Sequence, residues 1–599
     1  MGRCSAPRLP LPPVLLSWPA LLRRPRRQRP AAVPGGRSLG ARPGGGATQA
    51  AIALPPRLRA SGEPRRPGPS LARLVPTTLL AALMAAPLAG CQPRRPEGLL
   101  ILAGKSRIDS LDPASASRVA VLQVLSALGD PLYAIGSDGR LEPRLATALP
   151  RVSSDGLRAR IPLRPGVRFH DGTRFDAAAL VFSLERFMAI GTLGYQLSER
   201  VRRVRATGPL EVELELKHPF TPLPRLLSAA FLTPVSPSAY RAHRERPLAE
   251  RFVGTGPYRL AFASGQQLRL LPWRHYWGRR PRNRGLVIVS LSNSTALFGA
   301  LRSGEIDLLF SSGLEIDHQQ ALHREARTGR LREAVGPSLN IGLLSLRSDQ
   351  PPLEQARLRR ALALSLDRRT LSARVSLGMR PPLRQLVPPG LPGSDPTAWP
   401  DYDPAGARAL FQQAGYCRGR PLVLPLTFRS DIPTDRLFAL TWQAQVRRDL
   451  GDCLQLEVSG MESTTAYDQL GKGALALFLY DWSGDYPDAE NFLAPLLGCE
   501  ESRGERCLKG NAALSGSFWS APGLQAELVR SSSLQGRERE ALLRSIQTRT
   551  AAASPYLPVW LMAPVAWARP TLAPPRFDGS GWVVLADLEP VGPAPRRQP

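Results

Sequence analysis

Short apolar segments alternate with turn-rich and amphipathic segments over most of the chain. Residues 99–103 and 474–480 are continuously apolar, so both are predicted to be buried strands. Residues 115–128 have the apolar spacing of a helix. The pattern therefore predicts a chain that combines buried strands with helices.

The run between residues 157 and 186 gives the most detailed prediction. A strand leads to a turn at Pro165-Gly166, a second short strand follows, and Asp171-Gly172 marks another turn. Asp176 is then expected to cap a helix, because its carboxylate can accept a hydrogen bond from a free N–H of the first turn. The predicted apolar anchors of this helix are Leu180, Phe182 and Leu184.

Residues 1–73 differ from the rest of the chain in composition. They are rich in Pro, Arg, Gly and Ala and show no sustained apolar period. Such a segment cannot bury enough surface to offset the entropy lost on ordering, so we predict a disordered basic leader. Residues 1–64 are also too long for the usual basic part of a secretory signal, and an incorrectly assigned start codon is an alternative explanation for them.

Residues 74–91 have the pattern of a secretory signal. A basic flank that ends at Arg73 precedes the apolar residues 75–88, and small residues precede Cys91. The apolar run is too short for a comfortable membrane span. Leu88-Ala89-Gly90-Cys91 resembles the bacterial lipobox, which implies that Cys91 is lipidated and becomes the mature N-terminus. A plain signal peptide or an N-terminal anchor helix is the alternative.

Length and charge restrict the architecture and the function. A chain of 599 residues is too long for a single core and indicates several lobes. Of the net charge of +30, residues 1–90 contribute thirteen through fourteen Arg and one Glu, and acidic residues are interspersed through the rest. Aromatic residues make up only 6%, and no zinc-finger or RNA-recognition motif is present. We therefore interpret the charge as arginine-rich composition and expect no nucleic-acid partner.

Six cysteines are present, and none forms a Cys-x-x-Cys pair. Because histidines are also few, a structural zinc site is not expected. Four cysteines are left when Cys91 and the one cysteine of the leader are set aside. Cys499 and Cys507 flank a short polar loop that a local disulfide could close. Cys417 and Cys453 would then form a second pair. An oxidising compartment favours these disulfides, whereas four unpaired thiols are the alternative.

Residues 478–492 form the candidate functional stretch. The predicted strand runs into Asp481-Trp482-Ser483-Gly484-Asp485, and the chain then turns at Tyr486-Pro487 toward a short helix. In α/β domains, ligands bind where strand ends converge on a crevice. Trp482 provides an apolar surface and Asp485 a negative charge. This combination suits a ligand that has an ammonium group next to an apolar group. Alternatively, Trp482 is a core residue and Asp485 caps the following helix.

Further motifs, in order along residues 99–570, make the chain resemble a known family. They are turns and helix starts with fixed residue types: Leu163-Arg164-Pro165-Gly166-Val167-Arg168-Phe169-His170-Asp171-Gly172, Gly254-Thr255-Gly256-Pro257-Tyr258, Trp273-Arg274-His275-Tyr276-Trp277-Gly278, Gly304-Glu305-Ile306-Asp307, Leu358-Arg359-Arg360-Ala361-Leu362 with Leu366-Asp367-Arg368, and Tyr402-Asp403-Pro404 with Gln413-Ala414-Gly415-Tyr416. On these motifs the chain resembles the extracellular solute-binding proteins of family 5, the peptide- and nickel-binding receptors of ABC importers. The candidate stretch resembles that family's Trp-x-x-Asp-Tyr-x-Asp-Pro loop. The motif at Trp273–Gly278 departs from the family pattern at one position, because His275 stands where an Asp-like residue is usual.

The resemblance implies an α/β fold of the type II periplasmic-binding-protein kind, with two lobes, a hinge and an extra domain. Domain I is expected to combine three segments of the chain, and domain II to be the extra domain. The expected boundaries are 99–140, 250–340 and 555–599 for domain I, 141–249 for domain II and 341–554 for domain III. The chain should cross between the lobes near residues 340 and 555, and the lobes should close on the ligand.

The resemblance also implies a function. The expected protein is a monomeric lipoprotein of the periplasm or cell envelope, anchored to the membrane by its lipid. It would capture di- or oligopeptides and deliver them to the permease subunits of an ABC importer. In the family's peptide-binding members, the aspartate of the Trp-x-x-Asp motif binds the ligand's ammonium group, a role that falls to Asp485. Trp482 would line a side-chain pocket, and Tyr480 and Gly484 complete the predicted substrate-binding set.

Two other functions fit parts of the sequence. A nickel or metal-chelate receptor belongs to the same family, but residues 478–492 contain no histidine. An envelope hydrolase could use Asp481, Asp485 and Asp488 as an acid cluster, but no nucleophile–base constellation, such as Gly-x-Ser-x-Gly with a plausible His, appears. We therefore expect a binding protein and not an enzyme, with no cofactor and no metal.

Overall fold

The structure is a computed structural model that describes residues 98–591 apart from residues 109 and 250. The predicted leader, the signal segment and Cys91 lie outside the described residues, so the predictions made for them stay predictions. No described helix is both long and apolar enough to cross a membrane.

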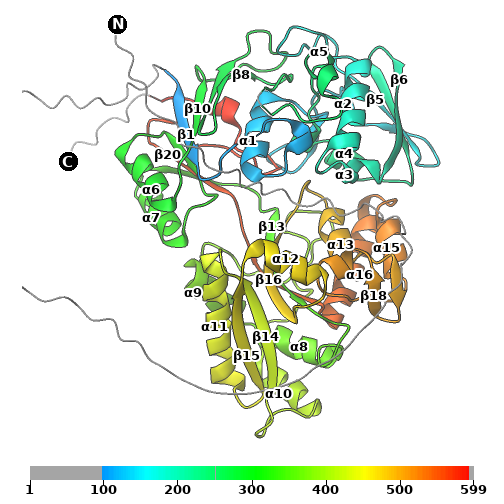
Figure 1. The fold of residues 1–599 in the computed structure, drawn as a ribbon, viewed down its shortest axis with the longest axis vertical. Coiled ribbons are helices and arrows are strands. Elements are labelled where there is room, and N and C mark those ends of the chain that lie inside the picture. Colours follow the sequence, from blue (N-terminus) through cyan, green and yellow to red (C-terminus); the bar gives the residue numbers. More distant parts are fainter. Residues whose placement is uncertain (1–97, 109, 250, 592–599) are drawn as a thin grey trace, which may run out of the picture. The chain divides into compact units, whose positions relative to one another are not determined.

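The first large sheet has seven strands, in the order β12-β20-β11-β1-β10-β9-β8 (Figure 1). Its strands are β1 (Leu100–Gly104), β8 (Tyr258–Ala263), β9 (Gln267–Pro272), β10 (Leu286–Ser290), β11 (Leu308–Phe310), β12 (Arg332–Val335) and β20 (Val565–Ala568). The apolar residues predicted at 99–103 thus form the central strand β1. Because β1 is parallel to both β10 and β11, the carboxyl ends of these three strands lie at the same edge.

The second large sheet has five strands, in the order β15-β14-β16-β13-β19. Its strands are β13 (Asn340–Leu346), β14 (Leu422–Arg429), β15 (Leu454–Met461), β16 (Leu477–Ser483) and β19 (Tyr556–Leu561). The apolar run at 474–480 supplies the first part of β16. Strand β14 is parallel to both β15 and β16, so these carboxyl ends also share one edge.

A smaller sheet of four strands lies between β3 and β8 in the sequence, in the order β4-β5-β7-β6. It contains β4 (Arg151–Val152), β5 (Arg158–Pro162), β6 (Val201–Gly208) and β7 (Glu211–Leu216) and is covered by α2 (Ala177–Ile190). Asp176 caps α2 as predicted, because its carboxylate accepts a hydrogen bond from the N–H of Ala179 at 2.9 Å. Leu180 and Leu184 are buried and Phe182 is half-buried.

The second short strand expected near residues 167–169 is not formed. Arg168 makes a single bridge with Arg174, and the segment is otherwise a series of turns. The segment lies between the turns at residues 165–166 and 170–172, which leaves room for this one bridge and not for a longer ladder.

The remaining elements connect these sheets or cover their faces. The helices are α1 (Val119–Leu128), α3 (Tyr195–Ser198), α4 (Leu223–Leu226), α5 (Pro237–Tyr240), α6 (Ser294–Ser303), α7 (Ile316–Arg327), α8 (Ala356–Leu364), α9 (Arg368–Ser376), α10 (Pro404–Gln413), α11 (Pro433–Leu450), α12 (Ser463–Gly471), α13 (Glu490–Leu497), α14 (Asn511–Leu514), α15 (Leu524–Ser531) and α16 (Gly536–Ala553). The short pieces are β2 (Tyr133–Ile135), β3 (Leu141–Pro143), β17 (Glu501–Arg503), β18 (Arg506–Lys509), η1 (Pro113–Ser115), η2 (Ala230–Leu232), η3 (Arg241–His243) and η4 (Leu585–Asp587).

Within the described residues, the chain passes between the two large sheets at two places. The first passage joins β12 to β13 and the second joins β19 to β20. The second passage follows Leu561, a few residues later than the sequence indicated, because β19 pairs with β13 in the five-stranded sheet. The partition into three domains stays a prediction, with this boundary moved accordingly.

Candidate functional site

The candidate loop, residues 484–489, leaves the carboxyl end of β16 beside the end of its parallel neighbour β14. Strand β16 is longer than its apolar run, since Asp481, Trp482 and Ser483 still pair with β13. Free backbone groups and side chains converge at such strand ends, which is where ligands bind in α/β sheets.

Two of the predicted site residues are fixed by internal contacts. Tyr480 is buried, its ring stacks on Phe478, and its hydroxyl donates to the carbonyl oxygen of Ser515 at 3.3 Å. Gly484 donates its N–H to the carbonyl oxygen of Leu339 at 2.8 Å. A Cβ at Gly484 would lie 2.6 Å from the ring of Phe492. Tyr480 is therefore a core residue, and Gly484 allows the loop to pass close to α13.

Trp482 and Asp485 are both held by Asn491 of α13. The indole N–H of Trp482 donates to the carbonyl oxygen of Asn491 at 2.8 Å, and the N–H of Asp485 donates to Asn491 Oδ1 at 2.6 Å. Both residues remain half-buried rather than enclosed in the core. Their positions are thus fixed while part of each side chain stays accessible.

Asp485 does not cap the following helix. The residue before α13 is Ala489, and the carboxylate that accepts the N–H of Glu490 belongs to Asp488. The carboxylate of Asp485 instead accepts a hydrogen bond from Gln196 Nε2 at 2.8 Å. The helix-cap interpretation of Asp485 is therefore not what the structure shows.

The other carboxylates of this stretch are already paired with arginines. Asp481 pairs with Arg429 at 2.9 Å, Asp488 with Arg539 at 2.6 Å and Glu490 with Arg200 at 2.9 Å. Among the described residues, Asp485 has no ion-pair partner. It is the one carboxylate of residues 481–490 that is left for an external cation.

The environment of Asp485 disfavours its charge. Burial raises the pKa of Asp485 to about 6, and the hydrogen bond from Gln196 and the charge of Arg200 offset only part of that effect. A cation that binds beside Asp485 would remove this penalty, because an opposite charge stabilises the ionised carboxylate.

Residues of the smaller sheet's side complete the surroundings of the loop. Gln196 lies on α3 and Arg200 follows just after its end. Arg225 donates to the carbonyl oxygen of Pro487 at 3.1 Å. Tyr486 is fully buried in the same core as this region, and its hydroxyl donates to Glu490. No sequence motif predicts these contacts, because the partners lie between 262 and 290 positions before the residues they contact.

A small cavity of about 80 Å³ lies at the corresponding edge of the seven-stranded sheet. It adjoins the carboxyl ends of β1, β10 and β11 and the passage at Pro564. Its apolar lining includes Val119, Val124, Ile288, Phe310, Phe577 and Trp582. Sequence reasoning missed this cavity, because its walls come from six separate segments.

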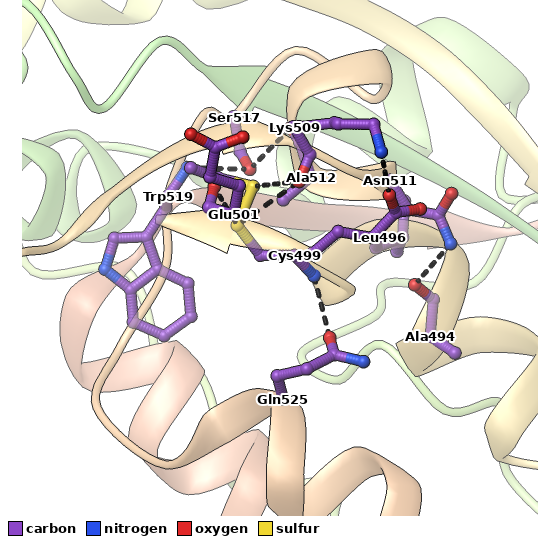
Figure 2. Close-up of a disulfide and its surroundings, with 12 residues drawn as sticks. Ala494, Leu496, Cys499, Glu501, Lys509, Asn511, Ala512, Ser517, Trp519 and Gln525 are labelled. Carbon is purple, nitrogen blue, oxygen red and sulfur yellow. Dashed lines mark hydrogen bonds and ion pairs between the residues drawn. A yellow bond between two sulfur atoms is a disulfide. The ribbon is translucent and has the colours of Figure 1, made fainter. Parts of the chain in front are cut away.

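The structure joins the four remaining cysteines in the two pairs suggested by the sequence. The Sγ atoms are 2.07 Å apart for Cys417 and Cys453, and 2.08 Å apart for Cys499 and Cys507. Figure 2 shows Cys499 in its surroundings, where its N–H donates to Gln525 Oε1 at 2.8 Å. Both pairs lie in the part of the chain that carries the five-stranded sheet.

Comparisons with known proteins agree on one group of relatives. A probable D,D-dipeptide-binding periplasmic protein, DdpA of Escherichia coli K12, is 27% identical over 427 residues, which cover 69% of this chain and 80% of that protein. The glutathione-binding protein GsiB of Salmonella paratyphi A is 26% identical over 411 residues, which cover 67% of this chain and 78% of that protein.

Solved structures show the same fold. NikA from Brucella suis, in complex with Fe(III)-EDTA, has a TM-score of 0.71 at 22% identity and covers 82% of this chain and 99% of its own. A dipeptide-binding protein from Pseudoalteromonas sp. SM9913, in complex with Met-Leu, has a TM-score of 0.66 at 20% identity, with the same two coverages. The predicted mixed α/β fold of periplasmic binding proteins is thereby confirmed.

A family model gives the assignment. The model described as "Bacterial extracellular solute-binding proteins, family 5 Middle" matches residues 140–504, which is more than half of the chain. This protein therefore belongs to the bacterial extracellular solute-binding proteins of family 5.

Proposed function

We propose that this protein captures peptides between its lobes and delivers them to the permease of an ABC importer. The observation that carries the proposal is the carboxylate of Asp485, which is half-buried, fixed in position and without an ion-pair partner among the described residues. The names of the relatives point the same way, since one is named as a probable D,D-dipeptide-binding protein and the other as a glutathione-binding protein.

In this proposal, the ammonium group of the peptide lies beside Asp485. The positive charge would stabilise the ionised form of a carboxylate that burial penalises. Closure of the lobes would exclude water and strengthen the pair, although desolvation of both charges offsets part of the gain. Trp482 offers an apolar face next to this charge, and the cavity beside Pro564 offers space for a small apolar group.

A nickel or chelate receptor is less well supported. NikA shares the fold, but a similarity at 22% identity does not show which ligand this chain binds. Residues 478–492 contain no histidine or cysteine, and the carboxylates of residues 481–490 other than Asp485 are paired with arginines. A divalent ion would therefore have to break existing ion pairs to obtain further ligands.

An enzymatic function is also less well supported. The acid cluster that a hydrolase would use is divided, because Asp481 and Asp488 are each paired with an arginine and only Asp485 is open. Family members are binding proteins, and a turnover assay on peptides that bind would separate the two functions.

The proposed location follows from the same assignment. We expect a periplasmic protein that is anchored through lipidated Cys91, acts as a monomer and contacts the importer's permease subunits. These features concern residues and partners outside the described structure, so each needs its own experiment.

The direct test is to identify what the protein carries. Protein purified from the envelope without denaturation should release peptides, detectable by mass spectrometry, and calorimetry should then measure their binding to the emptied protein. Release of a metal chelate in place of peptides, together with calorimetric binding of nickel, would replace this proposal with the second candidate.

A further inference from the structure

A cavity of about 610 Å³ lies beside the start of α9 (labelled in Figure 1), in the part of the chain that carries the five-stranded sheet. This volume is in the range of small-molecule sites. The walls come from residues 366–369, 382–385 and 401–402, together with Pro389 and Pro396. No residue of the candidate loop lines it, so this cavity is separate from the site proposed for the peptide.

Arg368 lines the cavity and has one guanidinium nitrogen without a partner. The residue is only 5% exposed. Its Nε donates to the carbonyl oxygen of Pro558 at 2.7 Å, and its Nη1 donates to that of Pro400 at 3.1 Å. Its Nη2 is buried and has no hydrogen-bond partner among the described residues. The guanidinium is therefore held in place by two carbonyl groups, and one of its nitrogens is left for a ligand.

Gln385 contributes a second buried polar group to the same cavity. The residue is 1% exposed, and its Oε1 has no hydrogen-bond partner in the described part of the chain. Buried donors and acceptors are normally paired, because an unpaired one loses its hydration without compensation. Arg368 provides a donor and Gln385 an acceptor, so a ligand that carries both an acceptor and a donor would pair with both residues.

The charges around the cavity do not balance. Arg384 pairs with Asp401 at 2.6 Å, and the carboxylate of Asp367 caps α9. Arg369 is exposed and forms no ion pair within residues 98–591 as described. The lining thus contains three guanidinium groups and two carboxylates, and a single negative charge from a ligand would balance it.

The environment of Arg368 penalises its charge. Burial and, after it, the charge of Arg384 lower the pKa of Arg368 to about 9, and the charge of Asp401 offsets only part of this effect. A guanidinium nevertheless stays protonated in proteins at neutral pH. An anion in the cavity would therefore stabilise a charge that the fold leaves poorly solvated.

We propose that this cavity binds a small organic carboxylate that also carries an O–H or N–H group. The carboxylate accepts hydrogen bonds from Nη2 of Arg368 and from the guanidinium of Arg369, and the O–H or N–H group donates to Oε1 of Gln385. Pro382 and Tyr402 line the same cavity and provide apolar contacts for the carbon atoms. A dianion such as phosphate fits less well, because its second negative charge would lie near the carboxylates of the wall.

The test uses the full-length protein and the probes lactate, propionate, propionamide and inorganic phosphate. Lactate has both the carboxylate and the hydroxyl, propionate lacks the hydroxyl, and propionamide lacks the charge. Ligand-detected NMR titrations give the dissociation constants, which are expected in the millimolar range for ligands of this size.

The variants are Arg368→Gln, Arg369→Gln and Gln385→Leu, with Arg374→Gln as the matched control. Arg374 is exposed on the same helix and does not line the cavity. Because binding of a probe elsewhere on the protein would not depend on the cavity residues, the comparison with the control locates the site.

Lactate should bind the wild type and Arg374→Gln alike, and propionamide should bind neither. Arg368→Gln should weaken lactate binding about tenfold or more, because it removes a charge-assisted hydrogen bond. Arg369→Gln should weaken it about threefold, because that guanidinium is exposed. Gln385→Leu should remove the preference for lactate over propionate and leave the affinity for propionate unchanged. Arg368 also holds two backbone carbonyls, so Arg369→Gln and Gln385→Leu decide the result if Arg368→Gln unfolds.

The inference is overturned if the wild type binds neither lactate nor propionate, if Arg369→Gln binds lactate as tightly as Arg374→Gln, or if Gln385→Leu still prefers lactate. Arg368 would then serve only to hold the two carbonyl groups. If phosphate binds as tightly as lactate and with the same dependence on Arg369, the assignment to carboxylates is wrong. Peptide binding should be unchanged in Arg369→Gln, so the proposed function stands or fails independently of this inference.

Discussion

The carboxylate of Asp485 accepts a hydrogen bond from Gln196 Nε2 at 2.8 Å, although 289 positions separate the two residues in the sequence. Gln196 is neutral and lies on α3, beside the smaller sheet. A neutral donor orients the carboxylate but leaves its charge uncompensated. The contact therefore positions Asp485 without replacing the cation that we expect from the ligand.

Substitution Asp485→Asn should weaken peptide binding about 100-fold or more, since removing one partner of a buried charge pair costs about 3–5 kcal/mol. Asparagine keeps the volume and an acceptor oxygen for Gln196, so the fold should be unchanged. N-acetylated peptides lack the ammonium group and should bind the wild type poorly, but they should lose little further affinity in Asp485→Asn.

Calorimetry on two proteins and two peptides gives the coupling energy between Asp485 and the ammonium group. A purely structural role would reduce the affinity of both peptides equally, and the coupling energy would then be near zero. Such a result would place the ammonium site elsewhere.

The hydrophobic pattern predicted β1 and the first half of β16, because long apolar runs are buried whatever their neighbours are. The second half of β16 was not predicted, since Asp481 and Ser483 are polar and are held in the strand only by pairing with β13. Motif resemblance located Asp485 on a loop. It could not reveal Gln196 as a neighbour, because the proximity of the two residues depends on how distant segments pack.

The lipidation of Cys91 can be tested without structural information. Metabolic labelling with a fatty acid should mark the wild type and leave Cys91→Ser unlabelled, because the acceptor thiol is gone. A protein that starts near Arg65 should be exported and anchored as well as the full chain. Equal labelling of wild type and Cys91→Ser would refute the lipidation.

The two disulfides should be present in protein recovered from the envelope. Peptide mapping under non-reducing conditions should link Cys499 to Cys507 and Cys417 to Cys453. Closing these loops, with sequence separations of 8 and 36, should stabilise the fold by about 2–4 kcal/mol each. Four thiols that react with an alkylating agent in denatured, unreduced protein would contradict both pairs.

The raised pKa of Asp485 predicts that this residue lowers stability at neutral pH. In the folded protein its pKa is about 6, above the ordinary value of 3.8, so the folded state binds more protons between these values. Stability contributed by the protonated form is present below pH 4 and is lost as the pH rises to 6. Asp485→Asn should therefore be more stable than the wild type by about 1–3 kcal/mol at pH 7 and similar to it at pH 4.

Asp488 provides a matched control for this prediction. It lies three positions further along, is buried, and forms two hydrogen bonds with Arg539 at 2.6 and 3.1 Å. Asp488→Asn should destabilise the protein by about 3–5 kcal/mol, because it leaves the buried guanidinium unpaired. Thermal unfolding of the three proteins at pH 4, 5, 6 and 7 measures both effects. If Asp485→Asn lowers the melting temperature at pH 7 as Asp488→Asn does, then Asp485 stabilises the fold. Its carboxylate would then not be the group that binds the ligand's ammonium.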